Sequence, residues 1–300
     1  MFDTIGIRYL HPLPKPFLVT WDTFNNKTNS YSHKFNFEGH VVNAVYHAYG
    51  YNNQTPLLNF YTSLPKLIHT CNHTMITEAE LPRAFRKLNY FLASILEFTD
   101  FEPVEKARLI RLDACRNFHV GNDLNNYLHV AKSVDVSRRK KRIYATGVQH
   151  VSDHHKINIY GKYKQCRHIE AKDIFRVENQ LCDPKLIEIE LGKRYPTLLD
   201  LNNTLAKRLI NSALHDLTLD ECGSYNLSRL EGLLIIGLGN GAKARNIIHY
   251  VRDKNTLDPE NLKTMYSRQT KNTYEKILRE LHLSSIAIDE ERKLPPLKIV

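Results

Sequence analysis

Three segments of this chain alternate polar and apolar residues with a period of two, which is the pattern of a β-strand with two different faces. They are RLIRLDACRNF (108–118), HKINIYGKYKQ (155–165) and IFRVENQL (174–181). In each segment one face carries mainly aliphatic or aromatic side chains and the other carries ionisable ones. Strands of this kind pair in antiparallel sheets, so this pattern restricts the fold more than any other feature of the sequence.

The order of the remaining segments predicts an α+β protein. Up to about residue 65, segments rich in β-branched and aromatic residues are separated by Gly, Asn and Pro, as strands are by turns. Thr77 and Glu80 form a capping-box pattern before an apolar helical repeat, and a second helix is expected over 122–134. From about residue 201 the apolar spacing is helical. We therefore expect a largely antiparallel sheet domain with flanking helices over 1–200, followed by a helical domain over 201–300.

Two local segments carry more specific expectations. KKRIYATGVQH (140–150) is expected to be one strand that forms a hairpin with the strand at 155–165, across the polar loop between them. LLIIGLGNGAKARNIIHYV (233–251) does not match the glycine spacing of a dinucleotide-binding turn. It is expected to be two helices joined by a glycine turn.

Composition limits the class of partner. The chain has 42 Lys and Arg residues against 32 Asp and Glu, a net charge of +10, which favours a polyanion such as nucleic acid. The five cysteines are scattered and form no CxxC pair, which indicates a reducing, cytoplasmic location rather than a disulfide framework or a cysteine-rich zinc site. No apolar stretch approaches the ~20 residues of a membrane span, and the N-terminus lacks a signal-peptide pattern. We expect no membrane association.

The polar faces of the three strands hold a chemically coherent set of residues. If the strands are neighbours, Asp113, Glu178, Tyr160 and Lys162 converge. Two carboxylates are hard oxygen ligands suited to Mg²⁺ or Mn²⁺, which can polarise a phosphodiester. A tyrosine phenol, with an ordinary pKa of ~10, attacks well only when a cation stabilises its oxyanion. Lys162 could do this or hold the phosphate, so the pattern indicates Tyr160 as a nucleophile in a metal-dependent reaction.

The same pattern also suits an ordinary antiparallel sheet with one solvated face. Asp113 and Glu178 would then form ion pairs with Arg111 and Arg176, which lie two residues away on the same faces. Periodicity alone does not separate the two interpretations.

Several cations are predicted to contact DNA. The run SRRKKR (137–142) precedes the segment with Tyr160 and could bind phosphates without reading base sequence, although a solvated loop is the alternative. Its cations are Arg138, Arg139, Lys140, Lys141 and Arg142. Arg111 and Arg176 are candidates for the same role.

The C-terminal segment PENLKTMYSRQTKNTYEKILREL (259–281) could form a helix-turn-helix motif. SRQT (267–270) would be the turn, and Lys271 would begin a basic second helix that faces DNA. An ordinary helical hairpin is the alternative.

Taken in order, these motifs resemble the rolling-circle replication initiators of filamentous phages, the gene II-type members of the phage and plasmid replication protein family. SLPKLIHTCNH (63–73) resembles a segment with a characteristic Ser, Lys and Asn in that family. IRLDACRNF, INIYGKYKQ and IFRVENQL resemble its Arg-x-Asp, Tyr-x-Lys and Arg-x-Glu strands. RQTKNTYEKILRELHLS (268–284) is similar to a helical segment after the nuclease domain. The likeness covers most of 1–200 and, more weakly, the rest.

The resemblance implies a replication initiator that nicks one strand of origin DNA through a tyrosine. The products would be a 5′-phosphotyrosyl link and a free 3′-hydroxyl primer, and the enzyme would later rejoin the displaced strand. Tyr160 matches the catalytic tyrosine, Lys162 the lysine of that motif, and Asp113 and Glu178 the acidic positions that would hold Mg²⁺ or Mn²⁺. The implied partners are single-stranded or supercoiled origin DNA, a host helicase and a polymerase, in the host cytoplasm.

The sequence departs from related nucleases in one respect. Many of them bind metal through a His-x-His pair, whereas no two of the fifteen histidines here are two residues apart. The metal site would then depend on Asp113 and Glu178, or on a histidine from elsewhere such as His154 or His155.

Tyr160 has two rivals as the nucleophile. In related plasmid initiators the nucleophile lies on the preceding strand, where Tyr144 is expected, and Tyr163 should point to the opposite face. We rank Tyr160 first, then Tyr144, then Tyr163. The alternative function is a non-catalytic, basic DNA-binding regulator of replication or transcription that uses the helices over 201–300.

Overall fold

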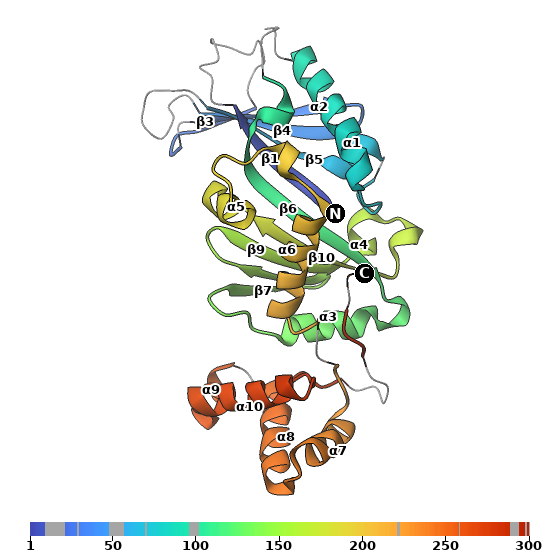
Figure 1. Cartoon of the computed structure of the whole chain (residues 1–300), viewed down its shortest axis with the longest axis vertical. Coiled ribbons are helices and arrows are strands. Elements are labelled where there is room, and N and C mark those ends of the chain that lie inside the picture. The colour runs from blue at the N-terminus through green and yellow to red at the C-terminus, as the bar shows by residue number, and fades with distance from the viewer. Residues whose placement is uncertain are drawn as a thin grey trace. The chain divides into compact units, whose positions relative to one another are not determined.

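The structure is a computed structural model of the 300-residue chain (Figure 1). It describes residues 1–9, 22–28, 30–47, 57–69, 71–95, 102–220, 223–257, 259–288, 294–297 and 299. Most of PFLVTWD (16–22), one of the strand-like segments expected before residue 65, lies outside the described residues, and so does Cys222.

The predicted α+β class is confirmed, with a large antiparallel sheet and flanking helices (Figure 1). The described strands are β1 (Phe2–Tyr9), β2 (Thr23–Asn25), β3 (Ser30–Phe37), β4 (His40–His47), β5 (Leu57–Ser63), β6 (Arg108–His119), β7 (Lys140–Tyr144), β8 (Gly147–Val151), β9 (His155–Gly161) and β10 (Ile174–Leu181). The described helices are α1 (Leu64–Ile68), α2 (Leu81–Ile95), α3 (Leu124–Ser133), α4 (Tyr163–Cys166), α5 (Pro184–Leu191), α6 (Asn203–Asp216), α7 (Leu227–Leu238), α8 (Gly241–Thr256), α9 (Pro259–Met265) and α10 (Arg268–Glu280). The strand order is β2-β3-β4-β5-β1-β6-β10-β9-β8-β7.

The chain divides into two compact units that alternate along the sequence. The first comprises Met1–Asn117, Ser152–Ile157 and Glu178–Ile210, and the second Phe118–Val151, Asn158–Val177 and Asn211–Val300. Strands β6, β9 and β10 and helix α6 therefore contribute residues to both units. The expected division into domains over 1–200 and 201–300 stays a prediction, although the expected helices after residue 201 are present.

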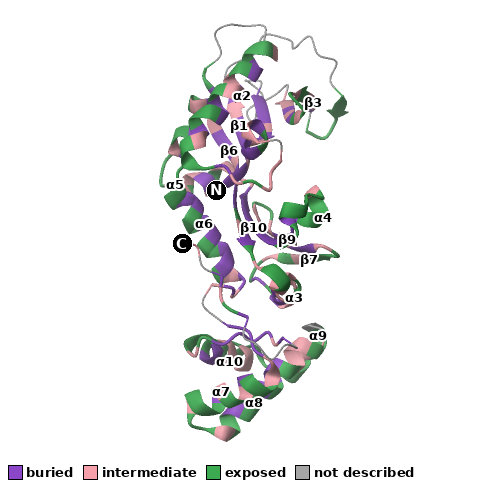
Figure 2. Cartoon of the chain, turned by 90° about the vertical axis from the view of Figure 1, so that its right-hand side faces the viewer, coloured by how far each residue is buried: buried purple, intermediate pink, exposed green. Residues whose placement is uncertain are grey.

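The first unit is built around β1, which pairs antiparallel with β5 on one side and with β6 on the other. Its core includes Phe2, Ile5 and Ile7, all essentially inaccessible to solvent. The capping box before α2 is confirmed, since the backbone N–H of Thr77 donates to Oε2 of Glu80 at 2.9 Å. Figure 2 shows β1, β6 and β10 as largely buried.

The segment 140–150, in the second unit, was expected to be one strand. It is instead a complete hairpin. β7 and β8 pair antiparallel from Lys140↔Val151 to Tyr144↔Gly147, with a two-residue turn between them. Gly147 opens β8 because no side chain fits there. A Cβ atom at this position would lie 2.0 Å from the Ile159 carbonyl oxygen and 2.7 Å from Cβ of Tyr160.

We expect Gly147→Ala to destabilise the protein by about 1–3 kcal/mol, because the new methyl group meets backbone that no rotamer change can move. Denaturant unfolding measures the change. Gly232→Ala, at an exposed position in α7 where a Cβ meets nothing within 4 Å, is the control and should stabilise by roughly 0.5–1 kcal/mol. Equal stability of Gly147→Ala and wild type would show that β8 and β9 approach less closely than described.

Helices α7 to α10 surround a small core of their own, which includes Leu230, Leu234, Ile247 and Val251. The expected glycine turn is confirmed: Gly239 ends α7 in the left-handed conformation, φ +58°. The side chain of Asn240 then caps α8 by accepting the Lys243 backbone N–H at 3.0 Å.

The expected boundary between the last two helices is wrong by about one turn. Ser267 caps α10 by accepting the Thr270 backbone N–H at 3.0 Å, so the helix begins at Arg268 rather than at Lys271. The residues SRQT are therefore the start of the helix and not the turn. A serine favours this because its hydroxyl satisfies a backbone donor that the first helical turn leaves unpaired. No helix in the described part of the chain has both the length and the apolar composition needed to cross a lipid bilayer.

Candidate functional site

The first unit contains three buried carboxylates that form an acidic cluster, since the charges of two of them raise the pKa of the third. Asp3, Asp113 and Glu178 are 6%, 2% and 7% exposed. Asp113 accepts two hydrogen bonds from Arg111, Nε to Oδ1 at 2.9 Å and Nη2 to Oδ2 at 2.6 Å. Burial raises the pKa of Asp113 to about 6, with further contributions from the charges of Glu178 and Asp3, although Arg111 opposes the shift. The two acidic residues expected from the sequence, Asp113 and Glu178, thus lie in one acidic cluster.

The third member, Asp3, was not among the residues expected from the sequence. The hydroxyl of Ser63 donates to its Oδ1 at 2.6 Å, and Nδ2 of Asn72 lies 3.5 Å from its Oδ2. Ser63 and Asn72 are the Ser and Asn of SLPKLIHTCNH, so that motif contacts the acidic cluster. The available signal was a carboxylate in the strand FDTIGIRY, next to the buried Phe2 and two residues from the buried Ile5.

The acidic cluster offers carboxylate oxygens, which suit a hard cation, but it does not supply a complete set of metal ligands. Among the described residues, no three His, Cys, Asp or Glu side chains are arranged to hold a metal ion. Mg²⁺ is usually bound through one or two carboxylates, with waters and substrate phosphates completing its shell. Asp113 and Glu178 match that mode. Arg111 occupies both oxygens of Asp113, so a metal would have to share the carboxylate or displace the guanidinium.

The two histidines considered as further metal ligands have other partners. His155 hydrogen-bonds through its ring to the side-chain amide oxygen of Asn179. His154 is mainly exposed and lies 3.0 Å from a carboxylate oxygen of Asp183. Neither contact joins the acidic cluster.

The polar face of β10 is not solvated, which contradicts the simple surface interpretation for this strand. All eight of its residues are buried, and Arg176 has no exposed surface at all. In the strand order β10 is a central strand, between β6 and β9. Full burial argues against the predicted contact of Arg176 with DNA. The expected Arg111–Asp113 ion pair does form, but Asp113 is buried within it.

The second unit holds Tyr160 and Lys162 together, by a geometry different from the expected one. β9 ends at Gly161, and Lys162, the residue before α4 (Tyr163–Cys166), already has helical backbone angles, φ −67° and ψ −32°. The expectation that Lys162 continues the strand is wrong. Its side chain nevertheless turns toward Tyr160, with Nζ 5.5 Å from the centre of the tyrosine ring. This ammonium group belongs to a fully buried residue and donates to Oε1 of Gln165 at 2.5 Å.

The four residues expected to converge divide between the two units. Asp113 and Glu178 belong to the first unit, while Tyr160 and Lys162 belong to the second. That the pairs act on one phosphate stays a prediction.

The rival tyrosines lie elsewhere in the second unit. Tyr144 ends β7 and is half exposed; β8 lies between β7 and β9, so it is two strands from Tyr160 rather than one. Tyr163 lies in α4, not on a strand, and its side chain is 41% exposed.

A basic groove of about 850 Å³ lies within the second unit. It is lined by residues from 133–141, from 215–218 and from α8, α9 and α10, with Ser285. Its cationic side chains are Arg139, Lys141, Lys254, Lys263, Lys271 and Arg279, against the carboxylates Asp135, Asp216 and Glu275. The groove therefore joins part of the basic run to the C-terminal helices, the two regions for which DNA contact was expected.

The basic run divides between the groove and the surface. Arg139 pairs with Asp216 at 2.8 Å and Lys141 with Asp135 at 2.7 Å, and both cations line the groove. Arg138, Lys140 and Arg142 are exposed and are not among the groove residues.

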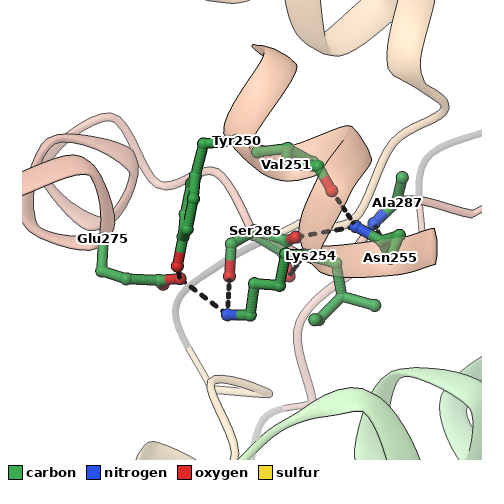
Figure 3. A network of polar contacts seen from close by, with 9 residues as sticks. Tyr250, Val251, Lys254, Asn255, Glu275, Ser285 and Ala287 are labelled. Carbon is green, nitrogen blue, oxygen red and sulfur yellow. Dashed lines mark hydrogen bonds and ion pairs between the residues drawn. The ribbon is translucent and has the colours of Figure 1, made fainter. Parts of the chain in front are cut away.

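One wall of the groove is held by a polar network between α8 and α10 (Figure 3). Glu275 accepts hydrogen bonds from the Tyr250 hydroxyl and from Nζ of Lys254, each at 2.6 Å, and Lys254 also donates to Ser285 at 2.7 Å. Burial opposes ionisation of Glu275, but the Lys254 ammonium and these hydrogen bonds lower its pKa below the ordinary value. The network holds α10 in place through Glu275. Lys271, four residues earlier on the same face of α10, lines the groove.

A buried histidine near the groove makes stability depend on pH. His150 on β8 is fully buried, and burial lowers its pKa, with Lys141 and Arg139 adding to the shift and Asp135 opposing it. The folded state keeps this ring neutral, whereas the unfolded chain protonates it below about pH 6.5.

We therefore expect the free energy of unfolding to fall as pH drops below about 6.5 toward the lower pKa of the folded protein. Denaturant unfolding between pH 7.5 and 5 measures this. His150→Gln, which does not titrate, should lose less stability than wild type over the same range. Equal pH dependence in both proteins would contradict the assignment to His150.

No protein family model matches the chain, and neither does any curated protein. Among solved structures, the chain is similar to a rolling circle replication initiator protein from Geobacillus stearothermophilus, with 14% identity and a TM-score of 0.29. The match covers 64% of this chain and 82% of that one.

Proposed function

We propose that this protein is a replication initiator of the filamentous-phage gene II type, which nicks one strand of origin DNA through Tyr160. The observation that carries the proposal is the approach of the buried Lys162 ammonium group to the Tyr160 ring, at 5.5 Å. A buried cation favours a negative charge nearby more strongly than one in water does. Of the three candidate tyrosines, Tyr160 is the one described with a buried lysine ammonium group beside its ring, whereas Tyr144 is half exposed.

In the proposed reaction the Tyr160 oxygen attacks a phosphorus atom of the DNA backbone. A bond forms between the phenol oxygen and phosphorus, and the bond to the 3′-oxygen breaks. The phenol loses its proton and the 3′-oxygen gains one, so the products are a 5′-phosphotyrosyl link and a free 3′-hydroxyl. Attack by a 3′-hydroxyl on the same link reverses the step and rejoins a strand. Because one phosphodiester replaces another, no energy source is needed.

Each pair of residues has its own part in this scheme. Lys162 stabilises the phenolate of Tyr160 or holds the attacked phosphate. Asp113 and Glu178 would hold Mg²⁺ or Mn²⁺, which when bound polarises the phosphodiester. Lys271, Arg139 and Lys141 in the basic groove would contact DNA phosphates.

The exposed cations of the basic run would add further contacts with the DNA backbone, without reading its sequence. They are Arg138, Lys140 and Arg142. In this role the partners are origin DNA, a host helicase and a polymerase, in the host cytoplasm.

The experiment that tests the proposal uses the full chain, Mg²⁺ or Mn²⁺, and supercoiled plasmid that carries the DNA flanking its own coding sequence. We expect nicked circles and a covalent protein–DNA adduct that survives denaturation in detergent, and EDTA should prevent both. Absence of nicking and adduct with both metals, on supercoiled and single-stranded DNA alike, would refute the proposal.

A second candidate is a non-catalytic DNA-binding regulator. The observation that favours it is the basic groove, which needs no chemistry to bind a polyanion, together with the occupation of Asp113 by Arg111. Salt-sensitive binding to the flanking DNA without any nicking would support this candidate.

A further inference from the structure

A second, smaller cavity of about 290 Å³ lies beside the Tyr160 segment, within the second unit. One face of α3 lines it with side chains four residues apart, Leu124, Leu128 and Lys132. The turn between β7 and β8 and the residues that follow β9 complete it. No function described so far uses this cavity.

The charge of the cavity is of one sign. Lys132, Lys164 and Lys172 line it together with His129, and none of its lining residues is a carboxylate. Within the described part of the chain none of the three lysines forms an ion pair; Lys132 makes a long contact, 3.5 Å, with the Ala145 carbonyl oxygen. Three lysines around so small a volume, without a compensating acid, favour an anion.

The rest of the wall is apolar and aromatic. Leu124 and Leu128 reach Gly161 closely, with methyl carbons 3.4 and 3.8 Å from where a Cβ atom of that glycine would lie. Tyr163, a residue that is 41% exposed, also lines the cavity. An exposed ring next to leucine side chains is a surface on which a nucleobase can stack, and such stacking tolerates any base.

We propose that this cavity binds one nucleotide of a DNA single strand, with its phosphate among the three lysines and its base against Tyr163. The volume is at the lower limit of ligand clefts, ~300–1,000 Å³, which suits one nucleotide and excludes a base pair. The site rests on the proposed function in one respect: Gly161 stands between Tyr160 and Lys162, so the bound nucleotide would lie next to the attacked phosphate. Tyr163 is then a positioning residue rather than a rival nucleophile.

The test measures binding of a short fluorescein-labelled single strand of mixed sequence to the full chain by anisotropy, over a range of salt concentrations and without added metal. Tyr163→Ala should weaken binding about 5- to 150-fold, the range that ~1–3 kcal/mol of stacking per base represents. Tyr163→Phe keeps the ring and should bind like wild type. Lys164→Glu and Lys172→Glu should each weaken binding and lower the slope of log affinity against log salt by about one.

Lys207→Glu, at an exposed position in α6 outside the cavity, makes the same charge change and is the control. Equal losses in Lys207→Glu and in the two cavity variants would overturn the proposal, because only the overall charge would then matter. Unchanged binding by Tyr163→Ala would also overturn it.

Competition separates a strand from a free nucleotide as the occupant. A deoxynucleoside monophosphate at high concentration should displace the labelled strand, and inorganic phosphate should do so more weakly. If the monophosphate binds but the two do not compete, the cavity is a small-nucleotide site and the proposal fails. Because these measurements need no nicking, their failure leaves the proposed reaction standing if wild type still forms the adduct. A missing adduct likewise leaves a positive binding result in place.

Discussion

Replacement of Tyr160 by phenylalanine should abolish the covalent adduct and reduce nicking by at least ~10³-fold, the order of effect expected when a nucleophile is removed. The phenol oxygen forms the new bond to phosphorus, and phenylalanine has no atom to replace it. The aromatic ring beside the Lys162 ammonium is retained, so the fold and the binding of DNA should change little. The measurement is the fraction of origin plasmid nicked, together with the adduct seen after denaturation.

Tyr144→Phe is the matched control, since it removes a phenol oxygen from the same unit at a half-exposed position. It should nick like wild type. The opposite result, an inactive Tyr144→Phe beside an active Tyr160→Phe, would assign the nucleophile to β7. Lys162→Met, which keeps the length of the side chain without its charge, should slow nicking by at least ~10-fold while leaving single-strand binding within a few-fold of wild type.

Asp113→Asn should cause the second largest loss, at least ~100-fold in metal-dependent nicking. Removal of a residue that only supports a metal ligand typically lowers metal affinity or activity by ~10–100-fold, and loss of the ligand itself should cost at least as much. The change keeps the size of the side chain and one oxygen for Arg111 but removes the negative charge that would bind the metal. Titration of Mn²⁺ into the protein, followed by calorimetry, gives a reading independent of activity and should show weakened binding.

The control for Asp113→Asn must remove an Arg–carboxylate ion pair without touching the acidic cluster. Glu188→Gln does this in the same unit, because Glu188 pairs with Arg108 at 2.9 Å. It should alter stability modestly and leave Mn²⁺ binding unchanged. If Asp113→Asn loses only stability and still binds Mn²⁺ like wild type, the Arg111–Asp113 pair is structural. With the pKa of Asp113 raised to about 6, Mn²⁺ affinity in wild type should also fall below that pH, as protons compete.

Much of the local structure follows from short-range rules in the sequence. The period-two segments are β6, β9 and β10, because an alternation with period two matches the alternating direction of side chains along a strand. The capping box at Thr77 and the glycine turn at Gly239 were also predictable, since each is decided by residues within one helical turn. In such places local chemistry leaves few alternatives.

The failures all concern contacts between residues distant in sequence, or the point at which a pattern stops. Periodicity predicts a strand through Lys162, because it does not show where the strand ends. Periodicity gives no role to Asp3, because its partners, Ser63 and Asn72, lie far along the chain. The residues around Gly147 predict one strand instead of a hairpin, since the approach of β9 that requires the glycine is not visible locally.

Short-range patterns therefore predict the class of fold and the type of most elements, and they point to a set of residues with a shared chemistry. Those predictions depend on periodicity, caps and side-chain type, which act over a few residues. The burial of Asp113 against Arg111, near Asp3 and Glu178, and the turn of Lys162 toward Tyr160 follow instead from tertiary packing. Burial and pairing depend on which strands and helices meet, because the cost of removing a charge from water is decided by all its neighbours together.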